Sequence, residues 1–348
     1  MKKLRSLLAL CLFASGVAMT APAAMAASNN NLTPYLAKHT SVPVCMKQFG
    51  GNEYTWHAPV NAVPELLAHG SYLGPCVAAA NLGDRRNMGD GYFQTYTQRN
   101  HDGTPWAIGI VFPASTLNNL PTDQYDGLNC FDTNQDGILQ LHNPVSDGAN
   151  QTDECGGGHE RELDFAHGDH KAIAPFKWAL VNFQMHGHSP NHVYTVPHFD
   201  FHFYTQDVIA RNFIRVGPCG LLVDCDDFKK GMQPVPAGYI HPDYMTVGAV
   251  ESRMGDHMID RTAPEWNGGQ FIETWMFGKY EGKLTFWEPM ITVDYFKSKP
   301  MMCKDVKVPQ LYREAGYYPT QYCIRYRQSR DEYTVSLEGF VYRAASPY

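Results

Sequence analysis

The stretch Pro197-His-Phe-Asp-Phe-His-Phe-Tyr204 alternates aromatic and polar side chains with a period of two residues. Successive side chains of a β-strand point to opposite faces, so this period predicts a strand. One face carries the phenylalanines at 199, 201 and 203 and predicts a core. The other face carries His198, Asp200, His202 and Tyr204. Imidazoles and carboxylates bind transition metals and transfer protons, so the polar face is a candidate functional site.

The spacing along this strand limits what one metal ion could bind. Neighbours on one face lie roughly 7 Å apart, so His198 and His202 lie roughly 13 Å apart. One ion could take Asp200 with one of these histidines, but it could take both histidines only if the strand bulges. The alternative is a buried polar ladder, in which Asp200 orients one imidazole and the other groups hydrogen-bond to neighbouring strands.

Two further strands are predicted on either side of Lys279-Tyr-Glu-Gly-Lys283. With Glu281-Gly282 at the tip of a two-residue hairpin, Trp275 lies opposite Glu288 and Glu273 lies opposite Met290. Glu273 and Glu288 are then diagonal neighbours on one face, roughly 7 Å apart. Two carboxylates among aromatic side chains need a cation or a hydrogen-bond donor, which a metal shared with the histidine face would supply. The alternative is that one of the two is exposed at the end of the sheet.

Other histidines are concentrated in the same part of the chain, with His188 in a predicted turn and His257 beside two carboxylates. The candidate ligands of zinc or another divalent transition metal are His188, His198, Asp200, His202, His257 and Glu288. A metal-dependent hydrolase or lyase would also need an open coordination position for water and a general base, for which Glu273 and Asp200 are the candidates. The alternative is an envelope binding, carrier or structural module, in which the same residues act without turnover.

Several motifs of the chain follow one another in an order that resembles a known family. They are Gly103-Thr-Pro-Trp-Ala-Ile-Gly-Ile110, Leu117-Asn-Asn-Leu-Pro121, Gly187-His-Ser-Pro190, the strand 197–204, Met254-Gly-Asp-His-Met-Ile-Asp260 and the hairpin 278–292. In this order they resemble an uncharacterised DUF5602-type bacterial domain family, over residues 85–120 and 173–297. The resemblance implies a mainly β domain that can assemble into a symmetric homo-oligomer, with no settled activity. The chain departs from the family by a long insertion after Pro121 and by a cysteine-bearing tail.

The amino terminus predicts export. Three basic residues precede an apolar run from Leu7 to Met19, and small residues around Ala26 predict signal-peptide cleavage between Ala26 and Ala27. Of the 28 basic side chains, three leave with the signal, so 25 face 35 acidic ones and the net charge becomes −10. This charge disfavours nucleic acid and anionic membranes as partners and leaves small molecules or metal ions. No later apolar stretch is long enough for an integral membrane segment, so a periplasmic or secreted protein is expected.

The cysteines agree with an oxidising compartment. Cys11 lies in the signal, and the remaining eight fall into four successive couples: Cys45 with Cys76, Cys130 with Cys155, Cys219 with Cys225, and Cys303 with Cys323. Sequential pairing into four disulfides is the prediction, although eight cysteines allow 105 pairings. No Cys-x-x-Cys motif supports zinc or thioredoxin-like chemistry.

The segment 122–171 is rich in Asp, Asn and Gly and has few apolar residues. Within it, residues 132–143 resemble a calcium loop, with oxygens from Asp132, Asn134 and Asp136 and a backbone carbonyl from Ile138. The twelfth position is an asparagine, so the last ligand would come from Asp147, Asp153 or Glu154. The alternative is an Asx-rich turn closed by a Cys130–Cys155 bridge. The polar residues 155–170 predict a solvated loop.

The composition favours a mainly β fold, that is, an α+β fold rich in strands. The chain has 23 prolines, 30 glycines and 13% aromatic residues, which suits an antiparallel sandwich or barrel. No linker separates two cores, so one domain is expected. The predicted organisation is a signal peptide over 1–26, an extended amino-terminal arm over 27–84, a β-rich domain over 85–297 with the insertion 122–171, and a disulfide-bearing extension over 298–348.

Overall fold

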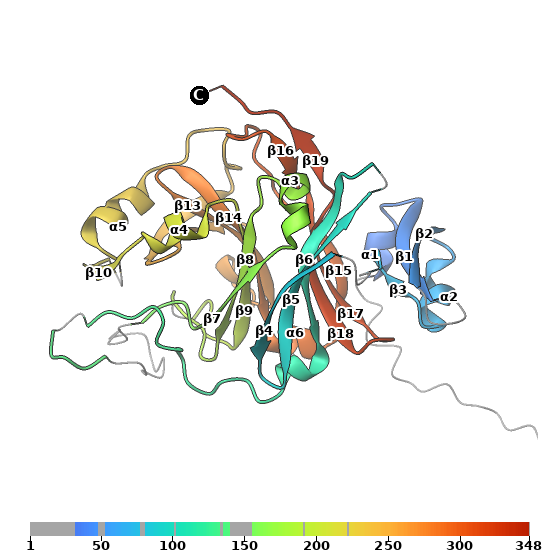
Figure 1. Ribbon diagram of the computed structural model, residues 1–348, viewed down its shortest axis with the longest axis horizontal. Helices are drawn as coiled ribbons and strands as arrows, with labels where there is room; N and C mark the ends of the chain where they lie inside the picture. The colour runs from blue at the N-terminus through green and yellow to red at the C-terminus, as the bar shows by residue number, and fades with distance from the viewer. Residues whose placement is uncertain are drawn as a thin grey trace, which may run out of the picture.

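A computed structural model describes residues 32–47, 53–76, 81–100, 102–132, 135–139, 155–190, 192–220 and 223–347. The predicted signal peptide 1–26 with its cleavage point, Asn134 and residues 140–154 lie outside the described residues. Within them, two large antiparallel sheets face each other as a sandwich (Figure 1). The predicted mainly β class is therefore confirmed.

The larger sheet has seven strands in the order β11-β12-β13-β14-β9-β8-β7. In chain order they are β7 (His159–Asp164), β8 (Trp178–Gln184), β9 (His198–Tyr204), β11 (Tyr244–Glu251), β12 (Gly255–Asp260), β13 (Glu273–Tyr280) and β14 (Lys283–Thr292). The alternating stretch quoted first forms β9, which pairs with β14 on one side and β8 on the other. All seven residues of β9 are buried, so both of its faces are covered.

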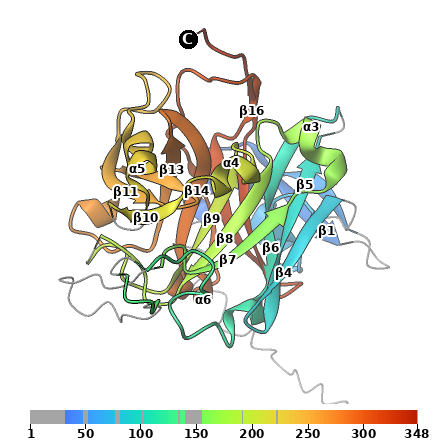
Figure 2. The same cartoon turned by 60° about the vertical axis from the view of Figure 1, so that its left-hand side comes forward.

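The second sheet has six strands in the order β15-β17-β18-β6-β5-β4. They are β4 (Leu82–Met88), β5 (Gly91–Arg99), β6 (Pro105–Pro113), β15 (Met301–Asp305), β17 (Gln321–Arg327) and β18 (Glu332–Glu338). The edge strands β4 and β7 of the two sheets are neighbours (Figure 2). The second sheet therefore joins the late strands β15, β17 and β18 to the early strands β4, β5 and β6.

Aromatic side chains from both sheets fill the space between them. Phe93 of β5 packs edge to face on Phe199 of β9, with ring centroids 5.4 Å apart. Phe112 of β6 stacks on Phe201 at 6.3 Å. The phenylalanine face of β9 is therefore the core face, as the alternation predicts, and its polar face lies on the opposite side of the larger sheet.

The amino-terminal segment is not the extended arm that the composition suggests. Residues 32–76 contain α1 (Leu32–Leu36), α2 (Val63–Ala68) and a three-stranded sheet of β1 (Ser41–Lys47), β2 (Glu53–Pro59) and β3 (Tyr72–Leu73). Val42, Val44 and Val63 are buried in a small core of their own. The prediction was wrong because the apolar residues of this segment are scattered and show no clear period in the sequence. They come together only when the strands pair.

The carboxy-terminal residues are part of the sandwich rather than an extension of it. β18 pairs with β6 from Glu332↔Pro113 to Glu338↔Ala107, and Ile324, Val335 and Leu337 lie in the main core. A smaller sheet pairs β16 (Gly316–Tyr318), which precedes β17, with β19 (Val341–Arg343), near the chain end marked in Figure 1. The predicted boundary at residue 297 therefore divides one sheet.

The insertion 122–171 also contributes to the fold. Residues 159–164, expected as part of a solvated loop, form the edge strand β7 against β8. Leu163 and Phe165 are buried in the core. A strand at the edge of an antiparallel sheet needs apolar side chains on one face only. A few apolar residues in this segment supply that face, so the largely polar segment can form a strand.

Short helices and turns connect the strands. They are η3 (Ala114–Leu117), η4 (His167–Asp169), α3 (His170–Ile173), α4 (Val208–Asn212), α5 (Cys225–Met232), η5 (Pro264–Trp266) and α6 (Val293–Lys297), together with the short strand β10 (Val216–Cys219). Asp224 caps α5 by accepting a hydrogen bond from the Asp226 N–H. No helix of the described residues is long and apolar enough to cross a membrane.

Three of the four predicted disulfides are confirmed: Cys45–Cys76, Cys130–Cys155 and Cys303–Cys323. The fourth couple is not bonded in the structure. Cys219 is half-buried and Cys225 is exposed, and both are thiols whose side chains interact. Their contact raises the pKa of the Cys225 thiol.

Alkylation of the protein without a reductant should therefore modify two cysteines, Cys219 and Cys225, and alkylation after reduction should modify six more. Peptide mass spectrometry would place the labels. Protection of both thiols before reduction would mean that the fourth bridge forms, and labelling of any other cysteine would contradict the three bridges.

Candidate functional site

The polar face of β9 belongs to the outer face of the larger sheet. Residues of β12, β13 and β14 lie beside it, and the loop after β8 covers one end. Two small apolar clusters flank the polar residues, one around Tyr204 and Phe286 and one around Tyr194 and Met290. The polar side chains are therefore enclosed rather than spread over a solvated surface.

The six predicted metal ligands form two groups of three. The His257 group consists of His202, His257 and Glu288, and the His188 group consists of His188, His198 and Asp200. In each group the three residues offer one ligand atom each, and these atoms lie within 4.8 Å of one another. The expectation that His198 and His202 are too far apart to share an ion agrees with this division. The candidate ligands therefore form two groups rather than one.

The His257 group takes its residues from three strands. The register on either side of Glu288 places it opposite His202, and the His202 Nε2–Glu288 Oε1 distance is 3.3 Å. His257 lies on β12, opposite Gly278 of β13. His202 and Glu288 are each only 1% exposed, while His257 is half-buried.

A β-bulge decides the direction of Glu288. The hairpin turns at Glu281-Gly282 as predicted, but Gly278 pairs with Phe286 while Lys279 pairs with Leu284, so Thr285 is an additional residue. Glu288 consequently lies opposite Met276 instead of Trp275. A shift of one residue changes the face of every following side chain, so the bulge moves Glu288 from the core face to the histidine face.

The predicted pairing of Glu273 with Glu288 is therefore wrong. Glu273 lies opposite Ile291 and points to the core side of the sheet. There its carboxylate forms an ion pair with Lys304 and accepts a hydrogen bond from Tyr322. Of the two predicted general bases, only Asp200 lies among the histidines.

The carboxylates adjacent to His257 in sequence are also used elsewhere. Asp256 forms a buried ion pair with Lys279 at 2.9 Å, and Asp260 forms a half-buried ion pair with Lys307 at 2.8 Å. The carboxylate that reaches His257 comes instead from a different strand, β14. Sequence neighbours on a strand point to opposite faces, which explains why Asp256 is turned away.

The His188 group combines a loop residue with two residues of β9. The His198 Nε2–Asp200 Oδ1 distance is 3.1 Å, and the His188 Nε2–Asp200 Oδ2 distance is 3.9 Å. The imidazole centroids of His188 and His198 lie 4.8 Å apart. Gln184 of β8 donates a hydrogen bond of 3.4 Å to Asp200 Oδ2 and so fixes the carboxylate from the side.

Backbone carbonyls fix the tautomers of three of the histidines. The Nδ1 atoms of His188, His198 and His257 lie 2.7, 2.6 and 3.1 Å from the carbonyl oxygens of Ser189, Val196 and Ala249. A carbonyl oxygen only accepts, so each Nδ1 carries the proton and donates it. In the neutral rings Nε2 then has the lone pair, which is the arrangement typical of metal-ligating histidines.

Several buried polar atoms of the two groups have no hydrogen bond. They are Nε2 of His198, Oδ1 of Asp200, both ring nitrogens of His202 and Oε2 of Glu288. Buried polar atoms in folded proteins nearly always have a partner, so this concentration requires an explanation. A polar ladder would satisfy these atoms, and the described residues do not.

Burial controls the protonation of the site. It lowers the pKa of His202 to about 3, so this imidazole is neutral at ordinary pH. Burial also raises the pKa of Glu288 well above its usual value, and the Asp200 and Glu251 carboxylates raise it further. Burial alone would raise the pKa of Asp200, but the adjacent His198 outweighs it and the pKa lies below its usual value.

One cavity of about 30 Å³ joins the two groups. Three carboxylates line it, from Asp200, Glu288 and Glu251, and none of its described lining residues is lysine or arginine. Glu251, at the end of β11, and Gln184 are residues that the sequence did not point to. A water molecule needs roughly 10–15 Å³ by this kind of measure, so the cavity holds an ion or two or a few waters.

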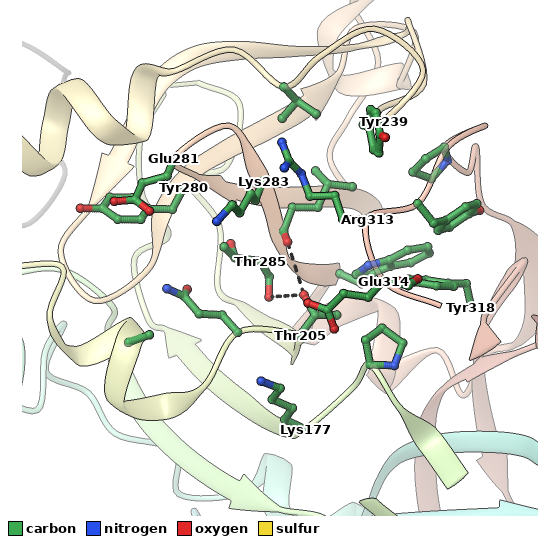
Figure 3. A pocket seen from close by; sticks show the side chains of 18 of the residues that line it. Lys177, Thr205, Tyr239, Tyr280, Glu281, Lys283, Thr285, Arg313, Glu314 and Tyr318 are labelled. Atoms are coloured by element: carbon green, nitrogen blue, oxygen red, sulfur yellow. Dashed lines mark hydrogen bonds between the residues drawn. The ribbon is translucent and has the colours of Figure 1, made fainter. Parts of the chain in front are cut away.

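A larger cavity of about 320 Å³ lies near the start of β8, the end of β9 and the β13–β14 hairpin. Tyrosines and Trp287 supply much of its wall, and Figure 3 shows Lys283, Arg313 and Glu314 between Tyr280 and Tyr318. Lys177 is paired with Asp207 at 2.8 Å, and Arg313 donates to the Gly282 carbonyl at 3.0 Å. This cavity mixes aromatic surface with charges of both signs.

The described part of the predicted calcium loop forms a turn. Asp132 accepts hydrogen bonds from the N–H groups of Asp136 and Gly137, and Asp136 accepts one from Ile138. Such bonds occur in an Asx turn with or without an ion, and Asn134 and the later candidates lie outside the described residues. Calcium binding stays a prediction.

Two other three-residue groups contain no available thiolates. Each is a disulfide with a nearby glutamate, Cys45–Cys76 with Glu53 and Cys303–Cys323 with Glu338. Disulfide sulfurs do not act as thiolate ligands, so these groups are not metal-site candidates.

The ring of Phe286 positions both histidines of the His257 group. Its centroid lies 4.8 Å from that of His202 and 5.2 Å from that of His257. The ring lies directly over Gly278, where a Cβ atom would overlap it. Gly278 therefore has two roles, the bulge and the close approach of Phe286.

Gly278→Ala should lower the free energy of unfolding by about 1–3 kcal/mol, because the added methyl group must displace the Phe286 ring. Urea denaturation would measure the loss. Gly168→Ala is the matched control, since a Cβ there meets open space. Equal stability of the two variants would contradict the proposed role of Gly278.

Comparison of the chain with models of protein families, with curated proteins and with solved structures finds no match. The resemblance to the DUF5602-type family is neither supported nor contradicted by this result and stays a prediction. The function must therefore be argued from the geometry of the two histidine groups and the two cavities.

Proposed function

We propose that the protein binds a divalent transition-metal ion, zinc or a similar metal, through His202, His257 and Glu288. The observation that carries this proposal is the approach of three ligand atoms, from the strands β9, β14 and β12 of one sheet, to within 4.8 Å of one another. Two histidines and one carboxylate are a common ligand set for such ions, and they leave a coordination position open.

The atoms of His202 and Glu288 that lack hydrogen bonds favour an ion over a hydrogen-bonded pair. Ligands roughly 2.1 Å from a tetrahedral ion lie about 3.4 Å from each other, so the observed 3.3 Å leaves room for an ion. A hydrogen bond between the two side chains would satisfy the atoms that it joins. Both ring nitrogens of His202 and Oε2 of Glu288 are instead without hydrogen bonds.

The size of the cavity bears on catalysis. Pockets for organic ligands usually measure about 300–1,000 Å³, at least ten times the roughly 30 Å³ found here. Metal binding without turnover of a large substrate, in a carrier or structural module of the cell envelope, is therefore the better-supported proposal. Hydrolase or lyase activity would require the cavity to open, and Asp200 would then be the general base for a metal-bound water.

Export to the periplasm or the extracellular space belongs to the same proposal. Three disulfides support an oxidising compartment. A symmetric homo-oligomer, implied by the family resemblance, is a further expectation that size-exclusion chromatography with light scattering would test.

Glu288→Gln tests the metal site directly. Glutamine has the shape of glutamate without its charge, so the metal-free variant should be as stable as the metal-free parent or more stable. Zinc at 100 times the dissociation constant of the parent should raise the parent's unfolding free energy by about 2.7 kcal/mol and should not stabilise the variant comparably.

Thermal unfolding with and without zinc would measure both effects, and His192→Asn, an exposed histidine outside both groups, is the control. A metal-free variant that is clearly destabilised, with an unchanged response to zinc, would favour the polar ladder.

A second candidate function is the binding of a small organic molecule in the cavity of Figure 3. Its volume of about 320 Å³ lies within the usual range for ligand pockets. Aromatic walls beside Lys283 and Arg313 suit a molecule with a flat apolar ring and an anionic or hydroxyl group. This proposal is independent of the metal.

Ala210→Trp should fill this cavity, because Ala210 lines it from α4. We expect the aromatic sulfonate 8-anilinonaphthalene-1-sulfonate to bind the parent with one equivalent and the variant at least tenfold more weakly, as measured by fluorescence titration. Ile209→Trp, on the same helix but outside the cavity lining, should bind like the parent. Equal binding by all three proteins would place the probe elsewhere.

A further inference from the structure

We propose that His188, His198 and Asp200 bind a second divalent transition-metal ion, so that the protein holds a pair of ions in one cavity. This inference rests on the proposed metal site at the His257 group, which it extends from one ion to two. The chemistry of the two groups is the same, since each has two imidazoles and one carboxylate.

The spacing in the His188 group fits an ion between its members. The two distances from Asp200 oxygens to imidazole nitrogens are 3.1 and 3.9 Å, on either side of the roughly 3.4 Å between ligands of a tetrahedral ion. Each oxygen of Asp200 faces a different imidazole. With this placement the Asp200 carboxylate could bind the ion through one oxygen or through both.

The tautomers argue against a simple hydrogen bond within the group. His188 and His198 donate their Nδ1 protons to the carbonyls of Ser189 and Val196. In neutral rings both Nε2 lone pairs then face carboxylate oxygens, which is a repulsive arrangement without a cation between them. His198 Nε2 and Asp200 Oδ1 are buried and neither has a hydrogen bond, despite their separation of 3.1 Å.

The charge of the cavity favours two ions over one. Asp200, Glu288 and Glu251 bring three carboxylates into about 30 Å³, and the described lining offers no lysine or arginine. A buried carboxyl group must either hold a proton, which burial favours for Glu288, or lie beside a cation. One divalent ion at Glu288 would leave Asp200 beside two imidazoles and the Gln184 amide, with no cation of its own.

The His188 group is also held in place independently of the His257 group. Gln184 fixes Asp200, and Gln124 donates to the Gly187 carbonyl at 2.8 Å while accepting from the His186 N–H. Phe271 packs edge to face on His198 with ring centroids 5.2 Å apart. Each half of the proposed pair thus has its own supporting residues, so one half can be removed while the other remains.

Zinc content after loading and dialysis, measured by elemental analysis, separates the two sites. The parent should retain two equivalents. His188→Asn and His257→Asn, which change one half-buried ligand of each group, should retain one equivalent each, and the double variant should retain almost none. His192→Asn, in the same loop as His188, should retain two.

The outcomes distinguish this inference from the proposed function. One equivalent in the parent, lost in His257→Asn and kept in His188→Asn, would leave the first site intact and overturn the second. Loss of all zinc in either single variant would mean one shared ion and would also overturn the pair. No zinc in the parent would overturn both proposals.

Circular dichroism would establish that each variant is folded. Isothermal titration of the metal-free parent with zinc provides a measurement that needs no variant. Two equivalents are expected, and a stoichiometry of one would overturn the inference even if a variant failed to fold.

Discussion

Burial of β9 on both faces is the constraint on which the rest of the structure depends. Its phenylalanines pack into the sandwich core, and its polar face is closed over by the loop after β8 and by the clusters around Phe286 and Met290. A polar face that cannot reach water must find partners inside the protein. The neighbouring strands provide one carboxylate and one imidazole but too few hydrogen bonds, and this deficit is the basis for a metal site.

Features that depend on residues close together in the sequence could be predicted. The period of two in residues 197–204 predicted both the strand and the division of its faces. The distance argument for His198 and His202 anticipated that they would not share an ion. The sequential cysteine couples are correct for three bridges; strand pairing holds Cys303 close to Cys323, and an isolated bridge holds Cys130 close to Cys155.

The errors came from register and from long-range pairing. A regular hairpin register between β13 and β14 places Glu288 on the wrong face of the sheet. The strands actually contain a bulge, in which Thr285 is an additional residue. Gly278 was a readable signal, since a glycine within a strand often marks a bulge or a close approach. The pairing of β18 with β6 joins residues more than 200 positions apart, and no local pattern specifies such a partner. The domain boundary at residue 297 failed for that reason.

The core and the site are separate in energetic terms, and this separation bears on what a bound ion can do. The sandwich core contains aromatic rings from both sheets, and no disulfide cysteine is among the described residues that line the cavity of the two histidine groups. Small domains that fold only around zinc lack such a core, so their binding energy is folding energy. A fold with such a core does not depend on an ion, so a metal bound as proposed would add stability without being required for folding. A site of this kind can lose and regain its metal while the sheet persists, which suits a carrier or an exchangeable centre better than a purely structural one.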